Sequence, residues 1–191
     1  MDQPRTLERA LAYHCAPALA GIKAADLFTW PNAAWGEVER YAGALARRGI
    51  RLRALRRGAR RTLLLVYRPA CLERCLSCPR VRALLEQAGY PAEGGAEVLL
   101  ARLMERLEGE AFPHEIGLFL GYPPEDVEGF CRYQGQNYKL SGRWKVYGDR
   151  EAASLRFQRY DHCRDALCRR LAVCPLLEVF HPVKGQEEAI H

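Results

Sequence analysis

Apolar residues recur every three or four positions along much of this sequence, a spacing typical of amphipathic helices. The first such segment covers residues 4–15, and Pro17 is expected to end it because proline breaks the helical hydrogen-bond pattern. His14 and Cys15 fall on its apolar face and are expected to point toward the core. Further helices are expected over 31–49, 71–77 and 79–88, after Gly95 with Val98, Leu99, Leu103 and Leu107 as a buried stripe, from Pro113, around Asp126, and from Asp149 through Leu171.

Two other segments alternate with a period of two, which indicates β-strands. From Ile50 apolar residues alternate with arginines, and the apolar run TLLLVY follows a short turn, so a hairpin is expected over about 50–67. A second hairpin is expected over 137–147, turning at Ser141 and Gly142. We therefore predict an α+β fold, in which a small antiparallel sheet built from these two hairpins is covered by about six helices.

The chain of 191 residues is long enough for one domain with its own core. We expect this domain to cover residues 1–180, with residues 181–191 forming a frayed tail. Apolar residues make up 49% of the chain and charged residues 27%, which excludes a disordered protein. The first residues lack the basic and apolar run of a signal peptide, and no apolar stretch is long enough to span a bilayer. A cytoplasmic protein with no membrane partner is therefore expected.

The net charge of +6 comes largely from one dense run of arginines in and before the first hairpin. This run could dock an acidic protein partner, or it could be the solvated edge of a helix and a hairpin. Nucleic acid is not favoured as a partner, because no aromatic residue interleaves with the arginines as base stacking would require. The run consists of Arg47, Arg48, Arg51, Arg53, Arg56, Arg57, Arg60 and Arg61.

Eight cysteines are more than packing usually requires in a reducing compartment, where disulfides are rare. Cys71, Cys75 and Cys78 have the CxxxCxxC spacing that binds iron–sulfur clusters in radical SAM enzymes, but the alternating strands and helices of their barrel are missing here. A simpler iron–sulfur site remains open, as does packing of the three thiols on one helix face. A second group could bind a metal only if the last helix breaks near Pro175. This group consists of Cys163, Cys168 and Cys174.

The segment FPHEIGLFLGYPPEDVEGF, residues 112–130, combines helix starts, helix breakers and one histidine. His114 follows a proline at the first position of an expected helix, where free backbone donors favour a neutral imidazole and a bound anion. Glu115 could cap this helix or orient the imidazole. As catalytic candidates we consider Cys15, His114 and Glu115, with a pairing of Cys15 and His114 across the fold. Packing of His114 beside Phe112 is the alternative, and capping accounts for Asp126.

Several polar residues lie at the ends of the expected strands. Brought together, they could clamp a phosphate or a carboxylate, although each alone is an ordinary surface residue. They are Arg68, Asn137, Lys139, Lys145 and Tyr147.

Five segments together resemble a family of bacterial proteins known as domain of unknown function 3793. They are HCAPALAGIKAADLF, LLLVYRP, FPHEIGLFLGYPPEDVEGF, GQNYKLSGRWKVYGD and YDHCRDALCRR, and the resemblance extends from about Leu7 to Arg170. It implies no activity, cofactor or catalytic residues. Members of the family occur mostly in anaerobic bacteria, near flavodoxin and ferrous-iron transport genes, which implies a link to iron or redox metabolism. The trio Cys71, Cys75 and Cys78 departs from the family pattern.

We therefore expect a protein that binds a small molecule or cofactor between the first helix, the helix from Pro113 and the second hairpin. The alternatives are an iron–sulfur protein or enzyme, and a basic module that docks an acidic redox protein such as flavodoxin. The cofactor, the reaction and the question of enzymatic activity stay open. The expected ligand-binding residues are His14, Lys23, Arg68, His114, Tyr122, Asn137, Lys139, Trp144, Lys145 and Tyr147.

Overall fold

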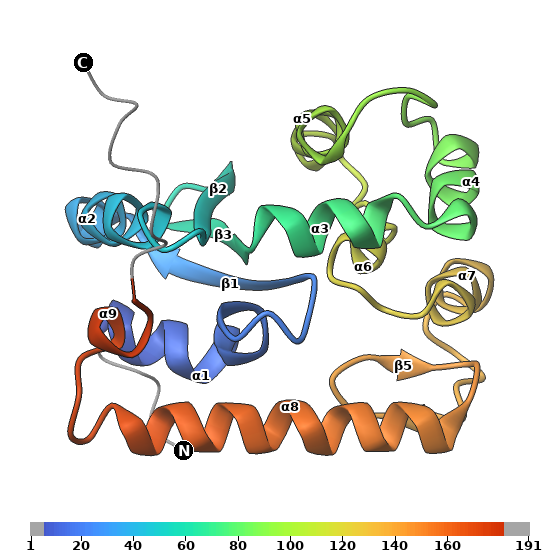
Figure 1. Cartoon of the computed structure of the whole chain (residues 1–191). Coiled ribbons are helices and arrows are strands. Elements are labelled where there is room, and N and C mark those ends of the chain that lie inside the picture. Colours follow the sequence, from blue (N-terminus) through green and yellow to red (C-terminus); the bar gives the residue numbers. More distant parts are fainter. Residues whose placement is uncertain (1–5, 182–191) are drawn as a thin grey trace.

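A three-stranded antiparallel sheet forms one part of the molecule (Figure 1). The structure is a computed structural model that describes residues 6–181. The strands are β1 (Ala25–Pro31), β2 (Arg51–Arg57) and β3 (Arg61–Tyr67), in the order β1-β3-β2. The first expected hairpin is therefore confirmed as β2 and β3, with a bulge in β2 between Ala54 and Arg56.

The sequence analysis missed β1. This strand pairs along its whole length with β3, from Ala25 opposite Tyr67 to Pro31 opposite Arg61. Asp26, Phe28 and Trp30 are buried on one face, but Asp26 is polar and the apolar Leu27 on the other face is half-buried, so the residue types lack the alternation that would have revealed the strand. Pro31, which we expected near a helix start, is the last residue of this strand. A short 3₁₀ turn, η1 (Asn32–Ala34), leads from there to α2 (Trp35–Ala46).

Four helices share a core with one face of the sheet. They are α1 (Leu7–Leu19), α2, α8 (Arg150–Arg170) and α9 (Leu176–Val179). The expected end of α1 at Pro17 was wrong, because the helix continues to Leu19. Pro17 lacks one helical donor, but the turn that contains it still closes, because the N–H of Ala20 donates to the carbonyl of Ala16 at 2.9 Å. The backbone N–H of Ala18, the residue after Pro17, donates to Asp26 Oδ2 in β1 at 3.0 Å.

The second half of the molecule consists of five helices that follow β3 in the chain (Figure 1). Their apolar faces share one core with the other face of the sheet, including Leu65 and Tyr67. Leu99, Leu103 and Leu107 are buried as expected, whereas Val98 was expected to be buried and is 47% exposed. The helices are α3 (Pro69–Leu76), α4 (Pro79–Gln87), α5 (Ala96–Leu107), α6 (Ile116–Phe119) and α7 (Pro124–Tyr133).

The second expected hairpin is present as β4 (Leu140–Ser141) and β5 (Lys145–Val146), but it forms its own two-stranded sheet and does not join the first. It packs between α7 and the first half of α8 (Figure 1). Asp149 caps α8 by accepting from the N–H groups of Glu151 and Ala152.

The fold is α+β, as predicted. Residues 6–181 contain nine α-helices, of which α6 and α9 are single turns, where about six were expected. No helix in that range is long and apolar enough to cross a membrane. The expected frayed tail lies almost entirely in residues 182–191, outside the described range.

Candidate functional site

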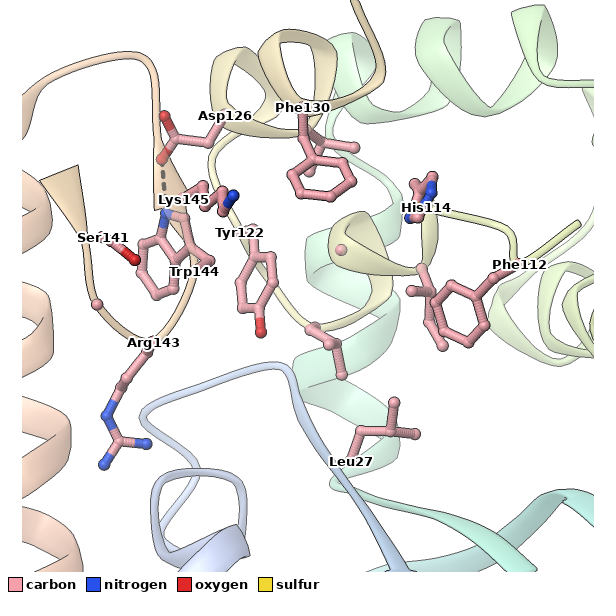
Figure 2. A pocket seen from close by; sticks show the side chains of 15 residues that line it. Leu27, Phe112, His114, Tyr122, Asp126, Phe130, Ser141, Arg143, Trp144 and Lys145 are labelled. Atoms are coloured by element: carbon pink, nitrogen blue, oxygen red, sulfur yellow. Dashed lines mark hydrogen bonds between the residues drawn. The ribbon is translucent and has the colours of Figure 1, made fainter. Parts of the chain in front are cut away.

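A cavity of about 410 Å³ lies between α6, α7 and the β4–β5 hairpin, and β1 borders it on one side (Figure 2). The side chains around it are mostly apolar or aromatic, with a few polar groups at its edge. The aromatic members are Phe112, Tyr122, Phe130 and Trp144, and the polar ones include His114, Ser141, Arg143 and Lys145.

Aromatic rings support each other along two walls of this cavity, which we call the aromatic cavity. Tyr122 stacks on Trp144 with ring centres 4.6 Å apart and an interplanar angle of 24°. Trp144 in turn meets the edge of Phe157 from α8 at 4.5 Å. On the other wall, His114 lies 4.8 Å from Phe130. Stacked and edge-on pairs of this kind are favourable contacts, so the rings hold each other in place.

Asp126 fixes the position of Trp144. Its buried carboxylate accepts the indole Nε1–H of Trp144 at 2.7 Å through Oδ2, and the N–H groups of Tyr147 and Gly148, each at 2.7 Å, through Oδ1 (Figure 2). The expectation that Asp126 caps a helix is wrong, because its carboxylate bonds to a different element. Its partners lie about twenty residues away, so no local pattern indicates the contact.

A second cavity of about 400 Å³ adjoins the first, between α1, β1 and α8, and we call it the polar cavity. The two cavities share Leu27, Leu120, Tyr122 and Arg143. The further residues of the polar cavity are mostly polar or charged: Tyr13, His14, Lys23, Asp26, Asp161 and Arg164.

A buried ion pair joins Lys23 Nζ to Asp26 Oδ1 at 2.5 Å in the polar cavity. Lys23 Nζ also lies 5.3 Å from the ring centre of Tyr122, within reach of a cation–π contact. Burial, together with the negative charge of Asp26, raises the pKa of Tyr122 to about 12. Tyr122 therefore stays a neutral hydroxyl at neutral pH. Asp26 was not among the site residues expected from the sequence.

Two arginines meet at one carboxylate oxygen on the other side of the polar cavity. Asp161 Oδ1 accepts from Arg143 at 2.8 Å and from Arg164 at 3.0 Å. Arg164 also contacts Asp165 at 2.9 Å. Arg143 has a buried Nε–H with no hydrogen-bond partner among the described residues. These residues were also missed, although the spacing of three between Asp161 and Arg164 on a helix was an available signal.

The two candidate histidines, His14 and His114, lie in different surroundings, and neither lies where it was expected. His14 was expected to face the core but is exposed, with its ring stacked on Phe28 at 5.9 Å. Partial loss of water around this ring lowers the pKa of His14, and Asp26 opposes that effect. His114 lies in a turn before α6, not inside a helix, and is exposed at the edge of the aromatic cavity. A four-residue helix provides no strong dipole for an anion there.

The other two catalytic candidates have structural contacts instead. Glu115 neither caps the helix nor orients His114, because its Oε1 accepts from Arg106 at 2.6 Å and from Tyr90 at 3.0 Å. Cys15 is fully buried among apolar residues of α1 and the sheet, and it lines neither cavity. Burial raises the pKa of its thiol well above the usual value. The structure does not bring Cys15 and His114 together.

The expected phosphate clamp at the strand ends does not form. Arg68 donates to the carbonyl of Leu19 at 2.9 Å, Lys139 donates to that of Gly148, and Tyr147 stacks on Tyr133. Asn137 is exposed, with a positive φ of 57°. Lys145 alone lines the aromatic cavity, while its Nζ donates to the carbonyl of Gly135 at 2.6 Å.

The cysteine groups are not arranged as three-ligand sites. Cys71 and Cys75 lie on α3 and point at the carbonyls of Gly21 and Leu118, whereas Cys78 is exposed at the start of α4, so the three do not share one helix face. The helix α8 ends at Arg170, before the break that was expected near Pro175. Cys163 and Cys168 pack against the core, and Cys174 lies beyond that helix end. Within residues 6–181, no group of three His, Cys, Asp or Glu side chains is placed to hold a metal ion.

Three arginines of the run make contacts with other residues of the protein. Arg48 donates to the carbonyls of Leu177 and Phe180, Arg53 pairs with Glu97, and Arg61 contacts Thr29. The remaining members of the run are exposed: Arg47, Arg51, Arg56, Arg57 and Arg60.

A family model described as "Protein of unknown function (DUF3793)" matches residues 11–178 of the chain. No curated protein and no solved structure matches the sequence. The matched range includes every residue that lines the two cavities. Because the match covers most of the sequence, this protein belongs to the DUF3793 family, a family of unknown function.

Proposed function

We propose that this protein binds a small molecule with a flat, largely apolar body in the aromatic cavity. The observation that carries the proposal is the stacked pair Tyr122 and Trp144, held in place by the buried carboxylate of Asp126. A stack fixed in this way offers a preformed face to an aromatic ring, so that binding costs little ordering of the protein.

The dimensions and chemistry of the cavity support this proposal. Its volume of about 410 Å³ lies within the range of roughly 300–1,000 Å³ that is usual for small-molecule sites. Such sites combine apolar walls with a few polar groups that fix the orientation of the ligand. Here His114 and Lys145 at the edge of the cavity are the polar groups that could do so.

Binding of 2-naphthol, an aromatic probe that is neutral at pH 7, tests the proposal by calorimetry. Phe112 is an aromatic member of the cavity and is 48% exposed, so Phe112→Ala should weaken 2-naphthol binding several-fold without harming the fold. Val98 is equally exposed, at 47%, and lines neither cavity, so Val98→Ala is the matched control.

A second variant blocks the cavity from another side. Ser141 is exposed and lines the aromatic cavity, so Ser141→Trp should fill part of it and abolish 2-naphthol binding. If Phe112→Ala and Ser141→Trp both bind the probe as well as the unaltered protein does, the aromatic cavity is not the binding site.

The link to iron or redox metabolism rests on the family resemblance. It predicts a coloured cofactor, which the absorption spectrum of protein purified without oxygen would reveal. A flavin band that Ser141→Trp removes would place such a cofactor in the aromatic cavity. A colourless protein would remove the redox link and leave the binding of an uncoloured ligand to the 2-naphthol test.

A further inference from the structure

We propose that the natural ligand carries an oxyanion, a phosphate or a carboxylate, which binds in the polar cavity against Arg143 while the aromatic body lies in the neighbouring cavity. This inference rests on the proposed function, because it concerns a second group on the same ligand. It is carried by the geometry where the two cavities meet.

Tyr122 and Arg143 form that junction. Both residues line both cavities. In Figure 2 the Tyr122 hydroxyl and the Arg143 guanidinium point the same way, away from Phe130 and Asp126. A ligand whose ring rests on the Tyr122–Trp144 stack can therefore extend past the Tyr122 hydroxyl and reach Arg143.

The cationic side chains around the polar cavity differ in how fully they are paired. Three lining side chains are cationic, namely Lys23, Arg143 and Arg164, and two are anionic, namely Asp26 and Asp161. Asp26 is already bonded, to Lys23 through one oxygen and to a backbone N–H through the other. Arg164 is further balanced by Asp165, whereas Arg143 shares Asp161 with Arg164 and has no carboxylate of its own.

The hydrogen bonds of Arg143 are incomplete in a specific way. Its Nη2 donates to Asp161 at 2.8 Å, but its buried Nε–H has no partner among residues 6–181. A buried donor without an acceptor is costly, so such a group is unusual without a ligand. The guanidinium fork binds two oxygens of a phosphate or carboxylate side by side, and the Arg143 side chain lines the polar cavity and is 24% exposed, so its Nη groups can offer this fork to an oxyanion.

Asp161 is the group that an incoming oxyanion would meet. Its side chain is 44% exposed, so it can turn into solvent when a second acceptor approaches Arg143. Until then it competes with the ligand for the guanidinium. Neutralising Asp161 should therefore strengthen the binding of anions, whereas loss of Arg143 should weaken it.

Three probes with the same ring system test this inference by calorimetry at pH 7: 2-naphthol, 2-naphthoate and 2-naphthyl phosphate. The better anion should bind at least about tenfold more tightly than 2-naphthol, and comparing the two anions distinguishes carboxylate from phosphate. Arg143→Gln should remove most of that advantage while 2-naphthol binds as before. Arg60→Gln removes the same charge from an exposed position and should change nothing.

Asp161→Asn provides a result of opposite sign, which loss of folding cannot imitate. It should raise the affinity for the anions several-fold and leave 2-naphthol unchanged. If the three probes bind equally, or if Arg143→Gln weakens all three alike, the oxyanion site is wrong while the aromatic cavity can still stand. If Phe112→Ala and Ser141→Trp leave 2-naphthol binding unchanged, the proposed function itself fails.

Discussion

The two hairpins of this protein are held in place by different means. The β2–β3 hairpin has two seven-residue strands, gains a third strand in β1, and lies in the middle of the core. The β4–β5 hairpin has only two residues in each strand. Its position depends on contacts with other elements, above all the three hydrogen bonds that Asp126 accepts from it.

This difference explains where the candidate site lies. A long ladder of backbone hydrogen bonds fixes a strand but leaves few of its side chains free for a ligand, because both faces of β3 are buried. The short hairpin presents Trp144 and Arg143 to the two cavities and leaves their precise placement to Asp126. Changes in the first hairpin should therefore affect the whole fold, and changes around the second should affect the site.

The largest effect is expected from Leu65→Ala at the centre of β3. Leu65 is fully buried and pairs with residues of both β1 and β2. Truncating a buried leucine leaves a cavity, so the free energy of unfolding should fall by about 3–5 kcal/mol. Urea unfolding followed by circular dichroism and by tryptophan fluorescence should show the same midpoint with both probes. Two separate midpoints would contradict a shared core.

A smaller and more local effect is expected from Asp126→Asn. The amide keeps one oxygen, which can serve either the indole of Trp144 or the two backbone donors of the hairpin, but never both. Because hydrogen bonds to a buried charge are strong, the free energy of unfolding should fall by about 2–3 kcal/mol. Trp144 should also lose its fixed position, and 2-naphthol should bind more weakly.

Asp149→Asn is the control for this change. Asp149 is exposed at the start of α8, where asparagine caps a helix as well as aspartate does. The variant should unfold at nearly the same urea concentration as the unaltered protein. If Asp126→Asn behaved like Asp149→Asn, Asp126 would be an ordinary helix-start residue, as the sequence first indicated.

Elements with a local hydrophobic pattern could be predicted from the sequence, whereas elements set by contacts between distant segments could not. The β2–β3 hairpin was found because the alternation of apolar residues with arginines in β2 and the short apolar run of β3 are both local patterns typical of strands. β1 was missed because its buried face includes the polar Asp26 while the apolar Leu27 lies half-buried on the other face, so residue type does not follow burial. Helix bounds shifted at Pro17 because the neighbouring Ala18 N–H is bonded by Asp26 from another element, which no local rule anticipates.

The candidate site was only partly foreseen, for a related reason. His114, Trp144 and Lys145 lie around the aromatic cavity, in segments that carry unusual residues and resemble the family. The pairing of Arg143 with Asp161 depends on the packing of the β4–β5 hairpin against α8, which the sequence does not show. Such pairings depend on how distant segments pack, so side-chain chemistry in the sequence marks the region but not the partners.

A third prediction compares two glycines inside helices. A Cβ on Gly129 of α7 would lie 2.3 Å from Tyr147 Cγ in the loop that follows β5, whereas a Cβ on Gly43 of α2 would meet nothing within 4 Å. Gly129→Ala should therefore cost about 1–2 kcal/mol through overpacking. Gly43→Ala should instead stabilise the protein by up to about 1 kcal/mol, because alanine favours helix. Thermal unfolding measures the stability of both variants. Equal changes in their melting temperatures would show that Tyr147 does not pack closely against α7 at Gly129.

The smallest effect concerns the ionisation of Tyr122 beside the second hairpin. Its pKa is raised to about 12 by burial and by Asp26, compared with about 10 in an unfolded chain. Between these values the unfolded state has lost the proton that the native state keeps, so this residue makes stability fall as pH rises from 10 to 12. Tyr122→Phe removes that contribution, and the variant should lose less stability over the same range. The difference in absorbance at 295 nm between the two proteins should show one tyrosine titrating near pH 12 in the native state and near 10 in urea. A step near 10 in both states would mean that Tyr122 is in contact with water, and the wall between the two cavities would then be open.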